Sequence, residues 1–84
     1  MRFEDIFEPI EVITYFRDGQ LQPLRFRWNG RVYKILHVHG QWQEHQGQGR
    51  QIHYSISSDG PDNFELLFDS GDFTWQLARI GMEG

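Results

Sequence analysis

The sequence predicts an all-β domain of about six short antiparallel strands, in a meander that forms a small barrel or roll. Two observations lead to this fold class. Short runs of β-branched and aromatic residues follow one another along the 84 residues, and a turn signal stands at each break. Asn29-Gly30 lies between two alternating runs, which is the strongest short-range signal for a β-hairpin. Closure or partial closure of the sheet would remove the exposed edges of an open sheet.

The N-terminal part of the chain is expected to contain one strand, Ile10–Phe16, because this run is rich in β-branched and aromatic residues. Large apolar residues stand on both of its faces, as in a central strand that is covered on both sides. Residues 1–8 are expected to be loosely ordered, with room for one short helical turn. Pro9 would end such a turn, since the residue before a proline avoids the helical region.

The second and third strands form the hairpin around Asn29-Gly30, and Pro23 is expected at the start of the second strand. A two-residue turn fixes the register of the hairpin. The inner-face pairs that it predicts are Trp28–Arg31, Phe26–Tyr33 and Leu24–Ile35. The outer-face pairs are Arg25–Lys34 and Arg27–Val32. A bulge at Gly40 would shift the alternation and carry the third strand on to Trp42.

The second half of the chain continues the same pattern. Glu44–Gly49 is polar and glycine-rich, and it predicts a mobile hairpin loop. The remaining predicted strands are Gln51–Ser57, Phe64–Phe68 and Phe73–Ile80. A turn at Ser70-Gly71 would pair Phe68 with Phe73 and Leu66 with Trp75. The expected core residues are Leu24, Phe26, Trp28, Tyr33, Ile35, Ile52, Tyr54, Ile56, Leu66, Phe68, Trp75 and Leu77.

Composition and charge indicate a single domain of 84 residues in the cytoplasm. The chain has no cysteine, which suits a reducing compartment. No apolar run is long enough to cross a bilayer, and the acidic N-terminus does not resemble a signal peptide, so no membrane is expected. The net charge is −4, but residues 17–50 carry six Lys or Arg against two acids. This asymmetry is compatible with one basic binding face.

Several segments together are typical of a known family. They are EPIEV at 8–12, PLRFRWNGRVY at 23–33, FELLFD at 64–69 and WQLARI at 75–80, with Trp42 and Tyr54. From Glu8 onward the chain resembles an uncharacterised family of small bacterial β domains, and the hairpin pattern F-x-W-x-G-R-x-Y is the most specific part. The resemblance extends to the C-terminal segment of catalytically inactive Y-family DNA polymerase homologues of the SOS mutagenesis system. It implies a small β fold and an association with DNA-damage tolerance, and no catalytic residue carries over.

The histidines are the main candidates for a chemical site. His37 and His39 form H-x-H on one predicted strand, and His53 lies on the neighbouring strand. Three imidazoles are a known ligand set for Zn²⁺, but only Glu44 adds an acid nearby, and no H-E-x-x-H signature is present. The alternative is solvated histidines, with one packed beneath Trp42. No nucleophile elbow or phosphate-binding glycine loop occurs, so we expect no enzyme, no metal and no cofactor.

A binding surface is expected on the outer face of the hairpin, where cations border an apolar stripe. Such a mixture favours a protein contact over a phosphate track. We therefore expect a non-enzymatic protein-interaction module that binds another protein or a second copy of itself, with weak or no affinity for nucleic acid. The alternative is a nucleic-acid-binding accessory domain linked to DNA-damage tolerance. The candidate binding residues are Arg25, Arg27, Arg31, Lys34, Arg50, Val32, Leu36 and Val38.

Overall fold

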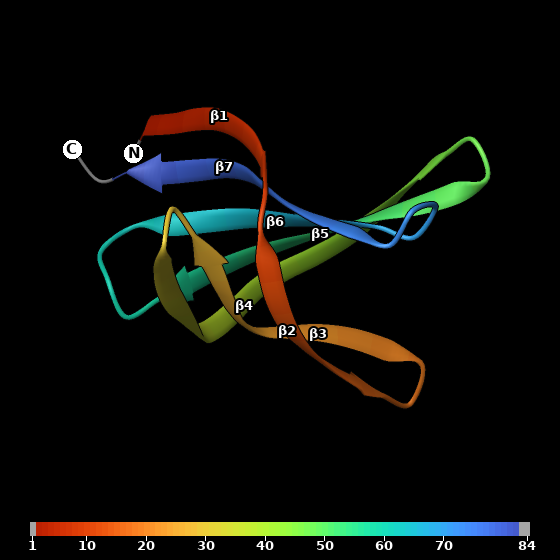
Figure 1. The fold of residues 1–84 in the computed structure, drawn as a ribbon, viewed down its shortest axis with the longest axis horizontal. Helices are drawn as coiled ribbons and strands as arrows, with labels where there is room; N and C mark the ends of the chain where they lie inside the picture. The colour runs from red at the N-terminus through yellow and green to blue at the C-terminus, as the bar shows by residue number, and fades with distance from the viewer. Residues whose placement is uncertain (1, 83–84) are drawn as a thin grey trace.

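The chain folds into one antiparallel sheet of seven strands, as Figure 1 shows. The computed structural model describes residues 2–82, except for the side chain at position 46. The strands are β1 (Arg2–Pro9), β2 (Glu11–Arg17), β3 (Gln20–Trp28), β4 (Arg31–Gln46), β5 (Gly49–Ser58), β6 (Asn63–Asp69) and β7 (Thr74–Met82). Their order across the sheet is β1-β7-β6-β5-β4-β3-β2. The prediction of an all-β meander is confirmed, with seven strands in place of about six.

The two outer strands of this sheet are consecutive in the chain. Ile10 alone separates β1 from β2, and its N–H donates to the main-chain oxygen of Trp75 at 3.2 Å. The sheet therefore curls so that its ends meet at Ile10. Within residues 2–82, β1 pairs only with β7 and β2 only with β3. The expected barrel or roll is thus an open, curled sheet that no β1–β2 ladder closes (Figure 1).

The N-terminal segment differs from the prediction. Residues 2–9 form strand β1, neither loosely ordered nor in a helical turn. They pair with β7, from Arg2–Met82 to Pro9–Gln76, because β7 would otherwise leave its second edge without hydrogen-bond partners. Ile6 packs against the core from this strand. A partner some 70 residues away in sequence outweighs the weak local preference of the segment.

The hairpin register around Asn29-Gly30 is confirmed from Trp28–Arg31 to Arg25–Lys34. Asn29 and Gly30 have φ angles of 52° and 75°, as a type I′ turn requires. The predicted Leu24–Ile35 pair is wrong. β4 leaves β3 at Ile35, and Leu24 is the extra residue of a bulge opposite β2. Leu24 is consequently 46% exposed.

The next hairpin is longer than predicted. β4 carries the expected irregularity at Gly40, together with a second one between Ile35 and His37. The predicted loop at Glu44–Gly49 is mostly strand, because β4 runs to Gln46 and β5 begins at Gly49. This outer end of the ladder consists of polar residues. Both of its faces meet solvent, so its strands can pair without apolar side chains.

The register of β6 and β7 also differs from the prediction. Phe68 pairs with Trp75 and Leu66 with Leu77, two residues further along β7 than expected. The turn has four residues between Asp69 and Thr74. Its conformation depends on the Asp69 carboxylate, which accepts the Gly71 N–H at 2.8 Å.

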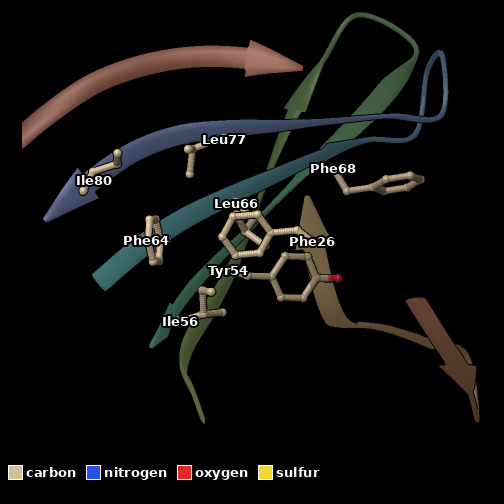
Figure 2. Close-up of a cluster of buried hydrophobic side chains, with 8 residues drawn as sticks. All are labelled: Phe26, Tyr54, Ile56, Phe64, Leu66, Phe68, Leu77 and Ile80. Atoms are coloured by element: carbon tan, nitrogen blue, oxygen red, sulfur yellow. The ribbon is translucent and has the colours of Figure 1, made fainter. Parts of the chain in front are cut away.

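The core lies on the concave face of the sheet (Figure 2). Six expected core residues are buried: Phe26, Tyr54, Ile56, Leu66, Phe68 and Leu77. Trp28, Tyr33, Ile35, Ile52 and Trp75 are half-buried against them, and Leu24 lies outside. Phe64 and Ile80 complete the cluster, and Phe64 meets Phe26 and Tyr33 edge-on at 5.3 and 5.2 Å. Large rings from four strands thus fill the curl of the sheet.

Candidate functional site

Four of the predicted binding residues come together on the outer face of β3 and β4. Arg25 lies opposite Lys34, and Arg27 lies opposite Val32 in the next row. The neighbouring strand β2 adds Ile13 beside Arg25. All five side chains are exposed. We call Arg25, Arg27, Val32 and Lys34 the basic face.

The other predicted binding residues lie elsewhere. The Arg31 guanidinium stands 5.0 Å from the centre of the Tyr33 ring, at the turn end of the hairpin. Leu36 and Val38 follow the point where β4 leaves β3, and Val38 pairs with Ile56 of β5. The predicted apolar stripe is therefore divided between two strand pairings. Arg50 lies on β5, where its N–H donates to the Ser70 hydroxyl at 2.8 Å.

The basic face keeps an excess of positive charge, although Glu11 lies opposite Arg27 in the β2–β3 ladder. Residues 11–34 carry five Lys or Arg and two acids, a balance of +3, whereas the rest of the chain has three Lys or Arg and ten acids. In the described part of the chain, the ion pairs of Lys and Arg involve Arg17 with Asp18 and Arg79 with Asp5 and Glu65. The cations of the basic face therefore present their charge to solvent.

Strand β2 supplies a free edge next to this face. Its pattern of large residues on both faces predicted a central strand, but β2 is the last strand of the sheet. Charge occurs only at its ends, Glu11 and Arg17, and Phe16 is 70% exposed. Natural edge strands usually carry lysine, proline or a bulge that prevents further pairing. β2 itself has none of these between its ends, and the bulge in its ladder with β3 lies on β3, at Leu24. Its outer edge can therefore accept a further strand.

The direction of the free backbone groups follows from the turn at Asp18-Gly19. Both turn residues have positive φ, and Arg17 pairs with Gln20 across a two-residue turn whose closing pair is hydrogen-bonded. Antiparallel pairs alternate between bonded and non-bonded. Thr14 and Phe16 therefore point their N–H and C=O groups away from β3, toward solvent.

Two neighbours in β3 agree with this alternation. Pro23, opposite Thr14, has no N–H to donate to β2. The carbonyl oxygen of Leu21, opposite Phe16, accepts from the Tyr54 hydroxyl instead. The position of Pro23 offers no N–H to Thr14, and the Leu21 carbonyl is bonded to Tyr54. Both observations agree with Thr14 and Phe16 standing at non-bonded positions.

An aromatic cleft of about 580 Å³ opens beneath the free end of the β2–β3 hairpin. Figure 1 shows this hairpin diverging from the β4–β5 and β6–β7 ends. The residues that line the cleft come from β2 and β3 on one side and from β4 to β7 on the other. The lining includes no carboxylate among the described residues, and Arg50 is its cation. Its principal residues are Thr14, Phe16, Gln41, Gln43, Arg50, Ile52, Phe68, Phe73 and Trp75.

Phe73 is the most exposed aromatic residue of this cleft. It has a φ of 56°, is 79% exposed, and lies 5.8 Å from the Phe68 ring between centroids. A bulky residue in the left-handed region is rare; Phe73 adopts it in the turn between β6 and β7, and Phe7 on β1 has a similar φ of 52°. Sequence reasoning missed the cleft because its lining comes from six strands. The available signal was a phenylalanine directly after the polar run Ser70-Gly71-Asp72.

The histidines occupy the outer face of β4 and β5. The rings of His37 and His39 are 6.0 Å apart, and His39 Nε2 lies 3.0 Å from the Ser57 hydroxyl. His53 stacks on Trp42 with ring centres 5.0 Å apart and planes at 4°. Its Nδ1 lies 3.2 Å from Glu65 Oε2. Within residues 2–82, no group of three or more His, Cys, Asp or Glu side chains is placed to hold a metal ion.

No protein-family model, curated protein or solved structure matches this chain. None of the described residues belongs to a helix with the length and apolarity needed to cross a membrane.

Proposed function

We propose that this chain is a non-enzymatic protein-interaction module that receives an extended segment of another protein along the free edge of β2. The observation that carries the proposal is a seven-residue edge strand whose outward backbone groups and large side chains are exposed. Strand addition of this kind draws affinity from main-chain hydrogen bonds and specificity from alternate side chains. The absence of cysteine suits the same role in the cytoplasm.

The exposed side chains of β2 favour this function over an unused edge. Ile13, Tyr15 and Phe16 are large and exposed on a strand that, within residues 2–82, makes its ladder with β3 alone. An added strand would cover their sides and satisfy the main-chain groups of Thr14 and Phe16. Burial of apolar area contributes about 25 cal/mol per Å², so covering parts of three such side chains adds to the hydrogen-bond term.

The test uses the main-chain N–H of Thr14. Thr14→Pro removes the donor from the free edge, and proline is tolerated at edge positions whose N–H faces solvent. Thr14→Val is the matched control, because it keeps the N–H and the β-branched shape. Peptides selected from a random display library on the native chain should bind Thr14→Val equally and Thr14→Pro at least tenfold more weakly.

The library experiment has a second readout on the native chain. Titration of isotope-labelled protein with a selected peptide should shift the amide signals of residues 13–16 more than those of β1. Equal binding to both Thr14 variants, or amide shifts confined to other strands, would show that the edge of β2 is not the site.

The second candidate function is a nucleic-acid-binding accessory domain linked to DNA-damage tolerance, as the resemblance of the sequence suggests. The observation that favours it is the direct cross-strand pairing of Arg25 with Lys34, next to Arg27. Three adjacent cations can neutralise phosphates, and single strands also stack on exposed aromatic rings. Against it stands the balance of −7 outside residues 11–34.

A further inference from the structure

We infer that the segment received by β2 alternates acidic residues with large apolar or aromatic residues. This inference rests on the proposed function and adds the chemistry of the partner to it. The two faces of β2 have different surroundings. Ile13 borders a small pocket on the outer side, whose charged lining residues are Arg25, Arg27 and Glu11. Glu11 lies opposite Arg27, so Arg25 and Lys34 supply the excess positive charge of this side. Thr14 and Phe16 line the aromatic cleft on the other side.

An added strand would meet both surroundings at once. Successive side chains of a strand point to opposite faces of a sheet, so every second residue of the partner would share the face of Ile13. The residues between them would share the face of Phe16, above the cleft. Alternate side chains of one extended segment would therefore lie beside the basic face and above the cleft.

The outer positions favour acids. Strands lie about 4.8 Å apart, so an outer residue of the partner would stand about 10 Å from β3, a distance that an arginine and a glutamate side chain bridge only by reaching toward each other. That separation is close to the Debye length of about 8 Å at physiological salt, so the attraction is only partly screened. Arg25 and Lys34 have no ion-pair partner within residues 2–82, and a lysine in the partner would add to their repulsion.

The inner positions favour large apolar residues. The rings of Phe16 and Phe73 are the most exposed phenylalanines, and Phe68 and Trp75 pack 5.1 Å apart behind them. A side chain that entered the cleft would cover these rings.

Two other occupants fit these surroundings less well. The free edge of β1 in a second copy is acidic, but its inward residue Ile6 already packs in its own core and could not fill the cleft. Nucleic acid cannot form a β-ladder with Thr14 and Phe16, and Arg50 is the cation among the described residues that line the cleft. A separate polypeptide with the alternating pattern can form hydrogen bonds with the edge of β2, pair acids with the cations and bury apolar side chains in the cleft.

The experiment compares three synthetic heptapeptides by fluorescence anisotropy at 50 and 150 mM salt. EFEVEFE has the inferred pattern, KFKVKFK reverses its charge, and EEFVEFE keeps its composition while breaking the alternation. We expect EFEVEFE to bind at least tenfold more tightly than either of the others, and more weakly at the higher salt. Equal binding of the three peptides would overturn the inference.

Charge reversal supplies the first pair of variants. Arg25→Glu should lower the affinity for EFEVEFE at least tenfold and raise the affinity for KFKVKFK. Arg2→Glu makes the same change of charge at exposed Arg2 on β1. Its affinity for both peptides should stay within twofold of that of the native chain. If Arg2→Glu had the same effect as Arg25→Glu, the attraction would come from net charge and the basic face would have no part in recognition.

Phe73→Gly tests the cleft independently of folding. Glycine adopts positive φ freely, so the variant should unfold at an equal or higher denaturant concentration than the native chain. Its affinity for EFEVEFE should nevertheless fall at least fivefold. Phe3→Ala removes another exposed ring, on β1, and should leave binding unchanged. Unchanged binding in Phe73→Gly would remove the cleft from the site.

Thr14→Pro separates this inference from the function on which it rests. If all peptides bind the native chain alike and all lose affinity to Thr14→Pro, the edge function stands and the alternating pattern is wrong. If EFEVEFE binds Thr14→Pro normally, the edge function fails as well. If sedimentation shows a dimer of the native chain that Thr14→Pro dissociates, the partner is a second copy and the inference is wrong. If the native chain binds oligothymidylate with sub-micromolar affinity and Arg25→Glu abolishes this binding, the partner is nucleic acid and the inference is wrong.

Discussion

The hydroxyl of Tyr54 donates a hydrogen bond to the main-chain oxygen of Leu21, and so joins β5 at the centre of the sheet to β3. Figure 2 shows the Tyr54 ring within the core cluster, with its oxygen directed away from the other rings. The bond ties the β2–β3 hairpin to the rest of the fold at the edge of the aromatic cleft. The width of the cleft therefore depends on a buried side chain.

Tyr54→Phe should destabilise the fold by about 1–3 kcal/mol, because the Leu21 carbonyl would lose its buried donor. Tyr15→Phe is the matched control. Tyr15 is exposed, and the same change there should alter the free energy of unfolding by less than about 0.5 kcal/mol. Urea denaturation of both variants checks the difference, and equal midpoints would contradict this role for the bond.

The same tyrosine predicts a dependence of stability on alkaline pH. Burial raises the pKa of Tyr54 from 10.0 to about 12. A group whose pKa is raised by folding contributes stability that is fully present below its unfolded pKa and is lost as pH rises through its folded pKa. The native chain should therefore lose more stability than Tyr54→Phe between pH 10 and 12. Parallel unfolding curves of the two proteins over this range would contradict the prediction.

Two residues of β3 provide a matched test of the core. Phe26 is buried and stacks on Tyr33 at 4.8 Å, whereas Leu24 is 46% exposed on a bulge. Phe26→Ala should cost about 3–5 kcal/mol, enough to unfold a domain of this size. Leu24→Ala should cost less than about 1 kcal/mol. Far-ultraviolet circular dichroism during thermal unfolding distinguishes them, and similar losses would mean that the bulge is not formed.

Binding of single-stranded DNA should be weak at 150 mM salt, with a Kd no better than the non-specific range of about 10⁻⁴–10⁻⁶ M. The three cations of the basic face would give a log–log salt slope of about −2, since each neutralised phosphate contributes about 0.7. Titration of labelled oligonucleotide measures both quantities. Sub-micromolar affinity that Arg25→Ala and Arg27→Ala weaken would favour the nucleic-acid function.

Local chemistry in the sequence determined the β3–β4 hairpin and its continuation along β4. The hairpin register follows from Asn29-Gly30, because a two-residue turn of positive φ leaves one pairing between Trp28 and Arg31. The irregularity at Gly40 was predictable for a similar reason, since the change of alternation before Trp42 required it. The basic face was also predictable, because cross-strand pairing follows directly from that register.

Tertiary structure decided the register of β6–β7, the state of the N-terminus and the candidate site. Ser70-Gly71 indicated a two-residue turn, but the Asp69 carboxylate stabilises a four-residue one and moves the pairing by two residues. Residues 2–9 become a strand only because β7 offers its edge. The free edge of β2 and the cleft beneath Phe16 arise from the order of strands in the sheet. The consecutive pairings from β2 to β7 are the predicted meander, but the pairing of β1 with β7, which leaves β2 at the edge, joins residues far apart in the chain. No local pattern of polarity or turn chemistry encodes that contact.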